Sequence, residues 1–368
     1  MPKLNILKNS KRPKPDSRRQ AVLSTIIEEH VVSGDAVGSH KISERFAYAS
    51  GWSSATIRNV MSELEELGYL EQPHTSAGRI PTDKGYRYYV DHMLDSTRLS
   101  ANDVSAIESI GRGQEIAAQP NRLMEKASHV LSELSENVAI VVWPSLAENR
   151  LKQIRFMKLP DKRVLVVLVS TSNVVHDKVI TLSEEFIQDE LNRTARYLNT
   201  EYAGKTLPAI RAEIVALMKK DQALYDSVVR NAILLCELSL QDEDAGGADV
   251  FIDGALNILG KPEFSSAERI RELFRTLEEK SRLVKILNEC LAGDSVTENV
   301  RIIIGRENPA ASMQHCAVIS GSYRVAPDVC GTLSVVGPTR IEYGRMVAVV
   351  NYLARFIERA FVTQASLH

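Results

Sequence analysis

The sequence predicts a mixed α+β protein with several domains, in which helices and strands are grouped along the chain. Three observations lead to this expectation. The chain has 368 residues, 44% of them hydrophobic and 25% charged, which suits two or three globular domains. Its first hundred residues have the pattern of three helices, a hairpin and a fourth helix. From about residue 138 strands are followed by helices and then by strands again, which indicates an α+β domain interrupted by a helical insertion.

Capping residues and apolar periodicity define the elements of the first hundred residues. A first helix is expected over 17–33 and a shorter one from Ser39. Ser53 caps a third helix, which ends at Gly68. A short hairpin over 69–81 and a helix beginning at Thr82 follow. This order is that of a winged helix-turn-helix, whose third helix enters the major groove of DNA.

The third helix carries a short polar face opposite its apolar stripe. Asparagine can read adenine, arginine can read guanine, and the methyl groups of threonine and alanine can pack on thymine. Residues of the hairpin turn can reach a phosphate or the minor groove. The candidate DNA-binding residues are therefore Ser53, Ser54, Ala55, Thr56, Arg58, Asn59 and Ser62, with His74 and Arg79 from the turn.

Each of these assignments has an alternative. Any surface helix turns polar side chains outward, and helix–hairpin modules also dock on other proteins. His74 can be an ordinary turn residue. Arg79 can be a surface arginine paired with a nearby acid.

The first twenty residues carry an excess of positive charge, although the formal net charge of the chain is −2. Only Asp16 opposes the basic residues, which are Lys3, Lys8, Lys11, Arg12, Lys14, Arg18 and Arg19. We expect residues 1–16 to form a basic flexible arm that can meet phosphates or anionic lipid. A solvated tail without a partner is the alternative.

Beyond residue 98 the pattern predicts an α+β domain with a long insertion. Helices are expected over 122–136, 184–199 and 342–361. Strands are expected over 138–143, 151–159, 163–170, 174–182, 299–305, 313–320 and 331–336. Residues 207–292 have an almost wholly helical pattern.

Several classes of protein find no support in the sequence. The longest apolar runs are strand-sized, whereas a membrane helix needs about 20 apolar residues. The N-terminus lacks the apolar segment of a secretory signal, so we expect a cytoplasmic protein that does not engage membranes. The cysteines are too scattered for a zinc site and are expected to be buried thiols: Cys236, Cys290, Cys316 and Cys330.

No catalytic motif is present, so we expect no enzyme activity, no catalytic residue, no cofactor and no metal. Two pairs of sequence neighbours, His176-Asp177 and His315-Cys316, could suggest catalysis. On a strand, however, neighbouring side chains point to opposite faces. A catalytic pair is therefore disfavoured at both places.

One long run of residues closely resembles a known family. Residues 51–91 read GWSSATIRNVMSELEELGYLEQPHTSAGRIPTDKGYRYYVD. Two further segments support the match, AVGS at 36–39 and GPTRIEY at 337–343. Together they resemble the bacterial heat-inducible transcription repressor HrcA family, while the middle of the chain is matched by pattern only.

This resemblance implies a winged-helix DNA-binding domain over 17–97 and a GAF-like domain formed by 98–202 and 298–368. A mostly helical dimerising domain would be inserted over 203–297. The implied function is repression of heat-shock chaperone operons by a homodimer that binds the CIRCE inverted repeat in double-stranded DNA. A GroEL-type chaperonin is implied as a partner that modulates the repressor. A winged-helix regulator that senses a small molecule through its GAF-like domain is the alternative.

The sequence departs from the family pattern in three places. The segment from Phe46 to Trp52 is about two residues longer than usual, and His40-Lys41 replaces a pair that contains arginine. The basic arm before Ser17 is also longer. These departures bear on the pose of the second helix and on its contacts with phosphates.

Overall fold

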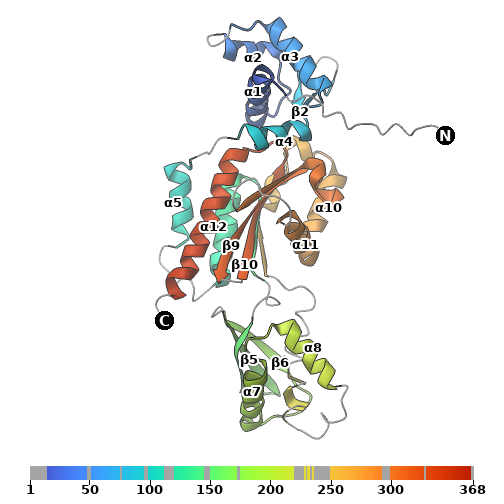
Figure 1. Ribbon diagram of the computed structural model, residues 1–368. Coiled ribbons are helices and arrows are strands. Elements are labelled where there is room, and N and C mark those ends of the chain that lie inside the picture. The colour runs from blue at the N-terminus through green and yellow to red at the C-terminus, as the bar shows by residue number, and fades with distance from the viewer. Residues whose placement is uncertain are drawn as a thin grey trace, which may run out of the picture.

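The computed structural model describes residues 15–47, 51–74, 77–94, 98–111, 120–144, 150–171, 175–218, 228, 230–232, 234–235, 249–291, 299–326 and 329–365. Within these residues the chain forms an N-terminal domain, a central domain built on a five-stranded sheet, and a lobe built on a three-stranded sheet (Figure 1). Of the predicted basic arm, residues 1–14 lie outside the described residues.

The N-terminal domain, residues 15–94, has the element order predicted from its sequence. Helices α1 (Ser17–Ser33), α2 (Ser39–Phe46) and α3 (Ser54–Glu66) precede a hairpin of β1 (Leu70–Glu71) and β2 (Ile80–Pro81), and α4 (Asp83–His92) follows. The N-cap of α1 is Asp16, not Ser17, because the Asp16 carboxylate accepts a hydrogen bond of 2.9 Å from the Arg19 amide.

The central domain is a three-layer sandwich around an antiparallel sheet with strand order β7-β3-β10-β9-β8. The strands are β3 (Val138–Val142), β7 (Val250–Asp253), β8 (Val300–Ile304), β9 (Cys316–Ala326) and β10 (Val329–Pro338). Helices α6 (Pro120–Ser135) and α12 (Tyr343–Ala365) cover one face, with α5 (Ala101–Ser109) outside them. Helices α10 (Ala267–Glu278) and α11 (Lys280–Leu291) cover the other face.

The lobe has a separate core. Its sheet contains β4 (Leu151–Lys158), β5 (Arg163–Ser170) and β6 (Val175–Thr181) in that order. Helices α7 (Gln188–Tyr202) and α8 (Leu207–Met218) supply apolar side chains that pack on one face of this sheet.

The sheet topology divides the chain differently from the predicted ranges. Strands β4, β5 and β6, which we expected in the GAF-like domain over 98–202, form a sheet of their own. Helices α10 and α11, which we expected in the insertion over 203–297, pack on the central sheet. Alternating apolar residues predict a strand but contain no information about the sheet that the strand joins.

The prediction of an almost wholly helical stretch over 207–292 is wrong at Val250–Asp253. These residues form β7, which pairs with β3 at the edge of the central sheet. A short apolar run does not distinguish a strand from a turn of buried helix. The next residues form two short 3₁₀ helices, Ala255–Ile258 and Pro262–Phe264.

The cysteines meet the expectation of buried thiols only in part. Cys290 and Cys316 are buried, Cys330 is exposed, and Cys236 lies outside the described residues. No helix in the described part of the chain is long and apolar enough to span a membrane.

The backbone of the hairpin lies close to the segment before α2, and a glycine makes this possible. Val37 and Arg79 exchange two backbone hydrogen bonds of 2.9 Å. A Cβ atom on Gly78 would lie 2.3 Å from the Val37 carbonyl oxygen. We expect Gly78→Ala to destabilise the protein by about 1–3 kcal/mol, because the two segments must separate. Thermal unfolding measures this loss.

Gly38→Ala is the matched control, because no atom lies within 4 Å of the Cβ that it would add. Equal melting temperatures for the two variants would contradict the role of Gly78.

Candidate DNA-binding surface

One face of helix α3 consists of a row of buried apolar side chains. Ile57, Val60, Met61 and Leu64 are all buried against α1 and the other helices of the N-terminal domain. Ser53 is the N-cap, as predicted, and its hydroxyl oxygen accepts a hydrogen bond of 3.2 Å from the Thr56 amide. The helix therefore presents a defined outer face.

The candidate residues of α3 occupy this face to different degrees. Ser53, Ala55, Arg58 and Asn59 are exposed. Ser54, Thr56 and Ser62 are half-buried. The hydroxyl groups of Ser54 and of Ser39 on α2 form a hydrogen bond of 3.0 Å. Within the described residues, no hydrogen bond or ion pair engages the side chains of Arg58 and Asn59. Both can therefore contact a ligand without breaking an existing interaction.

Two of the acids that follow on α3 are paired with arginines. Glu63 accepts a hydrogen bond of 2.8 Å from Arg19 Nε, and Glu65 accepts one of 2.8 Å from Arg79 Nε. Pairing offsets the negative charge that these carboxylates would present to phosphates. Glu66 remains exposed at the end of the helix.

The two hairpin candidates lie in different settings. His74 is exposed in the turn between β1 and β2. Arg79 is 18% exposed and is paired with Glu65, which corresponds to the alternative that the sequence left open for this residue. To contact a phosphate, Arg79 would have to release Glu65 or bind both groups at once, so its DNA-binding role stays a prediction.

Two features that fix α2 and the start of α3 were not predicted as such. The largely buried Glu29 on α1 pairs with Lys41 and Arg45 of α2, and the hydrogen bond from Lys41 lowers the pKa of Glu29. After α2, the rings of Phe46 and Trp52 lie 4.8 Å apart, centroid to centroid. The two ends of the segment between α2 and α3 thus meet in an aromatic contact, and an aromatic residue at each end was the sequence feature that could have predicted it.

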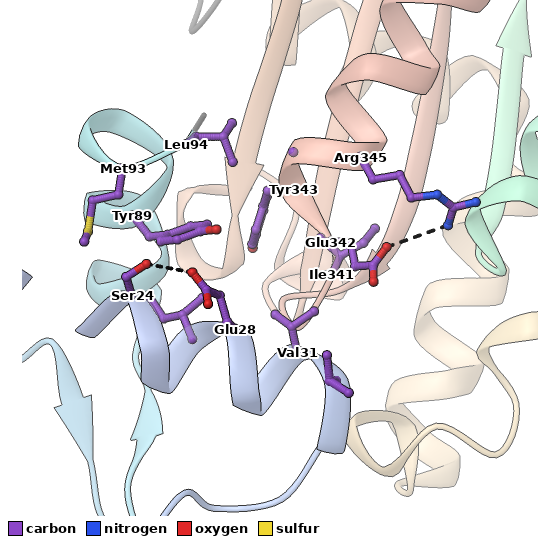
Figure 2. Close-up of a pocket in the computed structure, with 13 residues that line it drawn as sticks. Ser24, Glu28, Val31, Tyr89, Met93, Leu94, Ile341, Glu342, Tyr343 and Arg345 are labelled. Atoms are coloured by element: carbon purple, nitrogen blue, oxygen red, sulfur yellow. Dashed lines mark hydrogen bonds and ion pairs between the residues drawn. The ribbon is translucent and has the colours of Figure 1, made fainter. Parts of the chain in front are cut away.

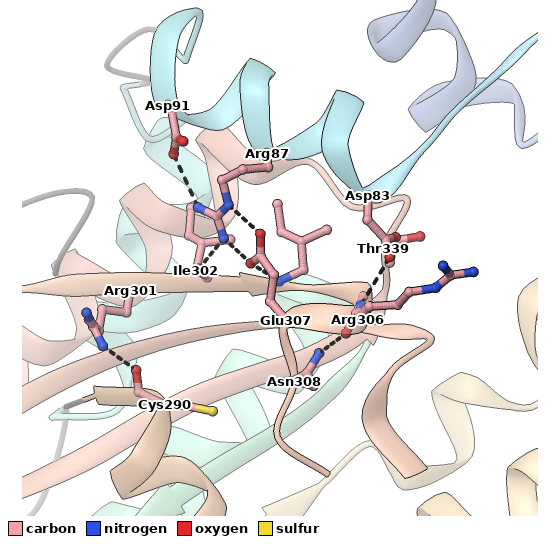
Figure 3. A network of polar contacts seen from close by, with 12 residues as sticks. Asp83, Arg87, Asp91, Cys290, Arg301, Ile302, Arg306, Glu307, Asn308 and Thr339 are labelled. Atoms are coloured by element: carbon pink, nitrogen blue, oxygen red, sulfur yellow. Dashed lines mark hydrogen bonds and ion pairs between the residues drawn. The ribbon is translucent and has the colours of Figure 1, made fainter. Parts of the chain in front are cut away.

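The N-terminal domain, which carries this surface, contacts the central domain through α4 and the end of α1. Arg87 of α4 donates hydrogen bonds to Glu307 and to the Ile302 carbonyl oxygen (Figure 3). Beside this contact a cleft of about 460 Å³ opens between α1, α4 and the start of α12 (Figure 2). Tyr89, Met93 and Leu94 line its α4 side.

Of the two neighbour pairs considered for catalysis, the structure describes both side chains of one pair only. His315 is exposed, whereas Cys316 is fully buried and burial raises the pKa of its thiol to about 12. For the other pair, the structure describes the backbone of His176 but not its side chain.

Comparisons with known proteins identify the family of the chain. A family model described as "HrcA protein C terminal domain" matches residues 121–347. The heat-inducible transcription repressor HrcA of Geobacter sulfurreducens is 37% identical over 342 residues, covering 93% of this chain and 97% of the relative. The chain belongs to the HrcA family. Members of this family are heat-inducible transcription repressors and not enzymes.

Further matches cover the same length. The HrcA repressor of Bacillus pumilus is 33% identical over 348 residues, covering 94% of this chain and 97% of the relative. A solved structure described as a hypothetical protein is 25% identical, with a TM-score of 0.63, and covers 95% of this chain and 99% of its own. The mixed α+β architecture therefore has a solved counterpart over nearly the whole chain.

The free side chains of α3 generate a test of base readout. We expect Asn59→Ala to cost about 1–3 kcal/mol of discrimination at one base pair of each half-site, because the alanine cannot form the two hydrogen bonds that an asparagine makes to a base. Competition binding with operator duplexes substituted one base pair at a time measures this loss.

Asn192→Ala, at an exposed asparagine of α7, is the control and should leave the discrimination unchanged. An equal loss on operator and on random DNA would instead make Asn59 a backbone contact.

Proposed function

We propose that this chain represses chaperone operons by binding the CIRCE inverted repeat as a homodimer, with a GroEL-type chaperonin as modulator. The central domain is the proposed GAF-like domain of the family. The observation that carries the DNA-binding part is the pair Arg58 and Asn59, exposed and unengaged in the described structure, on a capped helix buried along its inner face. Membership of a family of transcription repressors supports the rest.

A gel-shift assay with a duplex carrying the inverted repeat tests this proposal directly. We expect a specific complex that a shuffled duplex does not compete away, and a larger bound fraction when the chaperonin is added. Binding without preference for the repeat would contradict the operator assignment. An unchanged bound fraction would contradict the chaperonin assignment alone.

The proposed dimer needs an apolar surface, and the resemblance to the family places it in a mostly helical insertion over 203–297. Five apolar side chains on helices of this range are buried within the chain itself. Ile210 and Ile214 are buried in the core of the lobe. Leu283, Ile286 and Leu287 are buried against the central sheet. These side chains are therefore not free to meet a partner.

The outer face of the lobe sheet offers a better surface. Helix α7 covers the opposite face, where Ile154, Phe156 and Val166 are buried. The register places three cross-strand rows side by side on the outer face: Met157, Leu165 and Val179; Arg155, Val167 and Asp177; Gln153, Val169 and Val175. Six of these nine side chains are apolar.

Three of the apolar side chains are at least half exposed. Met157 is 52% exposed, Val175 59% and Val179 50%. Contiguous exposed apolar patches mark interaction sites, and the faces of two sheets can pack directly on each other. A second copy of this chain is the proposed occupant, because an inverted repeat requires a two-fold protein and a two-fold contact uses the same patch on both subunits.

We expect the double substitution Val175→Lys and Val179→Lys to convert the dimer to a monomer in analytical ultracentrifugation. The folded lobe should persist, because both side chains are exposed. Leu256→Lys, at a residue that is 71% exposed on the central domain, is the control and should remain dimeric. A dimeric double variant would place the interface elsewhere.

The basic arm is proposed to add affinity without specificity. Deleting residues 1–14 should flatten the plot of log K against log salt concentration by about 0.9 for each phosphate that the arm neutralises. Replacing the five basic residues of this segment with glutamine should give the same change in slope at constant length. An unchanged slope would leave the arm a tail without a role in binding.

A further inference from the structure

Arg87 is the main polar contact between the N-terminal and central domains. Its Nε donates a hydrogen bond of 2.8 Å to Glu307 Oε1, and its Nη2 contacts the other carboxylate oxygen. The same Nη2 donates to the Ile302 carbonyl oxygen at 2.7 Å. Glu307 is itself fixed, because its Oε2 accepts a hydrogen bond of 2.9 Å from the Ile304 amide. A two-pronged contact of this kind restrains orientation as well as distance.

A second contact lies at the start of α4 (Figure 3). The Asp83 carboxylate accepts a hydrogen bond of 3.1 Å from the Arg306 amide. It lies against Gly305, where an added Cβ atom would come within 2.2 Å of Asp83 Cγ. Gly305 also has φ +55°, a conformation that suits glycine. A side chain at position 305 would therefore prevent this close approach of the backbone to Asp83.

A third contact holds the other end of the N-terminal domain. Arg340, which precedes α12, donates from Nη1 to the Val31 carbonyl oxygen at 3.1 Å. Val31 lies in the last turn of α1, where a cation is favourable. Arg340 Nε also donates to Glu263 Oε1 at 2.6 Å, which anchors the arginine to the central domain. Its side chain is only 18% exposed.

The three contacts surround an apolar centre in which the rings of Tyr86 and Tyr343 lie 5.8 Å apart. On one side the junction is open, because the cleft in Figure 2 separates α1 and α4 from the start of α12. Apolar packing is not directional. The polar contacts around the centre therefore add to this packing in fixing the angle between the domains.

We propose that Arg87 and Arg340 are positioning residues for operator recognition, which set the spacing of half-sites that the dimer accepts. The inference rests on the proposed function, the binding of an inverted repeat by a homodimer. In a dimer joined at the lobes, each α3 is placed by its own domain junction. Two helices bind two half-sites together only if the fixed angle matches the phase of the DNA helix, which repeats about every 10–10.5 base pairs.

The test uses the full-length chain and duplexes of two kinds: a single half-site of the inverted repeat, and full repeats whose halves are moved apart in steps of one base pair. We expect the unsubstituted chain to prefer one spacing. Arg87→Ala, Arg340→Ala and Gly305→Ala should each keep the half-site affinity within about twofold. Their affinity for the preferred spacing should fall about tenfold, since the effective concentration of the second domain drops, and other spacings should be bound nearly as well.

Arg282→Ala is the control, because it removes an arginine–carboxylate pair of 3.3 Å with Glu279 in the central domain, and neither residue lines the cleft at the junction. It should keep the spacing preference. Melting curves confirm that each variant is folded. A spacing preference that stays sharp in the three junction variants overturns the proposal. So does a half-site affinity that falls as far as the full-site affinity, because the residues would then act on α3 itself.

A second measurement separates this proposal from the proposed function. Spin labels on Glu66 of α3 and Arg355 of α12 report the distance between the two domains, with Cys236 and Cys330 replaced by serine. The distance distribution should be narrow in the parent and broad in Arg87→Ala and Gly305→Ala. Narrow distributions in all variants contradict the positioning role. Failure of the parent to bind the repeat contradicts the proposed function and leaves this distance test intact.

Discussion

The apolar core of the N-terminal domain continues into the central domain without a break. Buried side chains of α1, α3 and α4 belong to the same cluster as those of α6, α12 and one face of the central sheet. Tyr86 and Tyr343, both almost fully buried, meet at the crossing point. Because this shared core cannot be exposed on one side without opening the other, the position of α3 depends on the central sheet as well as on its own small domain.

Electrostatic contacts add direction to this packing. Arg87 and Arg340 reach from one domain to backbone and carboxylate oxygens of the other, at opposite ends of the junction. Within the N-terminal domain, Arg19 and Arg79 pair with two acids of α3, and Arg58 and Asn59 stay unengaged on its outer face among the described residues. The lobe has a core of its own, so its sheet can meet a second subunit without disturbing α3.

The sequence predicted the local elements better than their assembly. The cap at Ser53, the buried row from Ile57 to Leu64 and the hairpin follow from periodicity and capping, which are local properties. The division of the strands between two sheets does not, since Val164 to Val169 reads as a buried strand in either sheet. The pairing of Arg79 with Glu65 joins residues 14 apart in the sequence across the hairpin, and the contact of Arg87 with Glu307 spans 220 residues. Nothing in the sequence around either arginine indicates whether its partner is a carboxylate of the protein or a phosphate of DNA.

Native-state hydrogen exchange, read segment by segment, tests most directly whether the N-terminal and central domains form one cooperative unit. Amides in a shared cooperative unit open with the same free energy. If the two domains form one unit, amides of α1 and α4 exchange with the same opening free energy as those of β9 and β10, while the lobe can open separately. Exchange of α1 and α4 at a clearly lower free energy than β9 and β10 would show that the N-terminal domain unfolds by itself, and would contradict a shared cooperative unit.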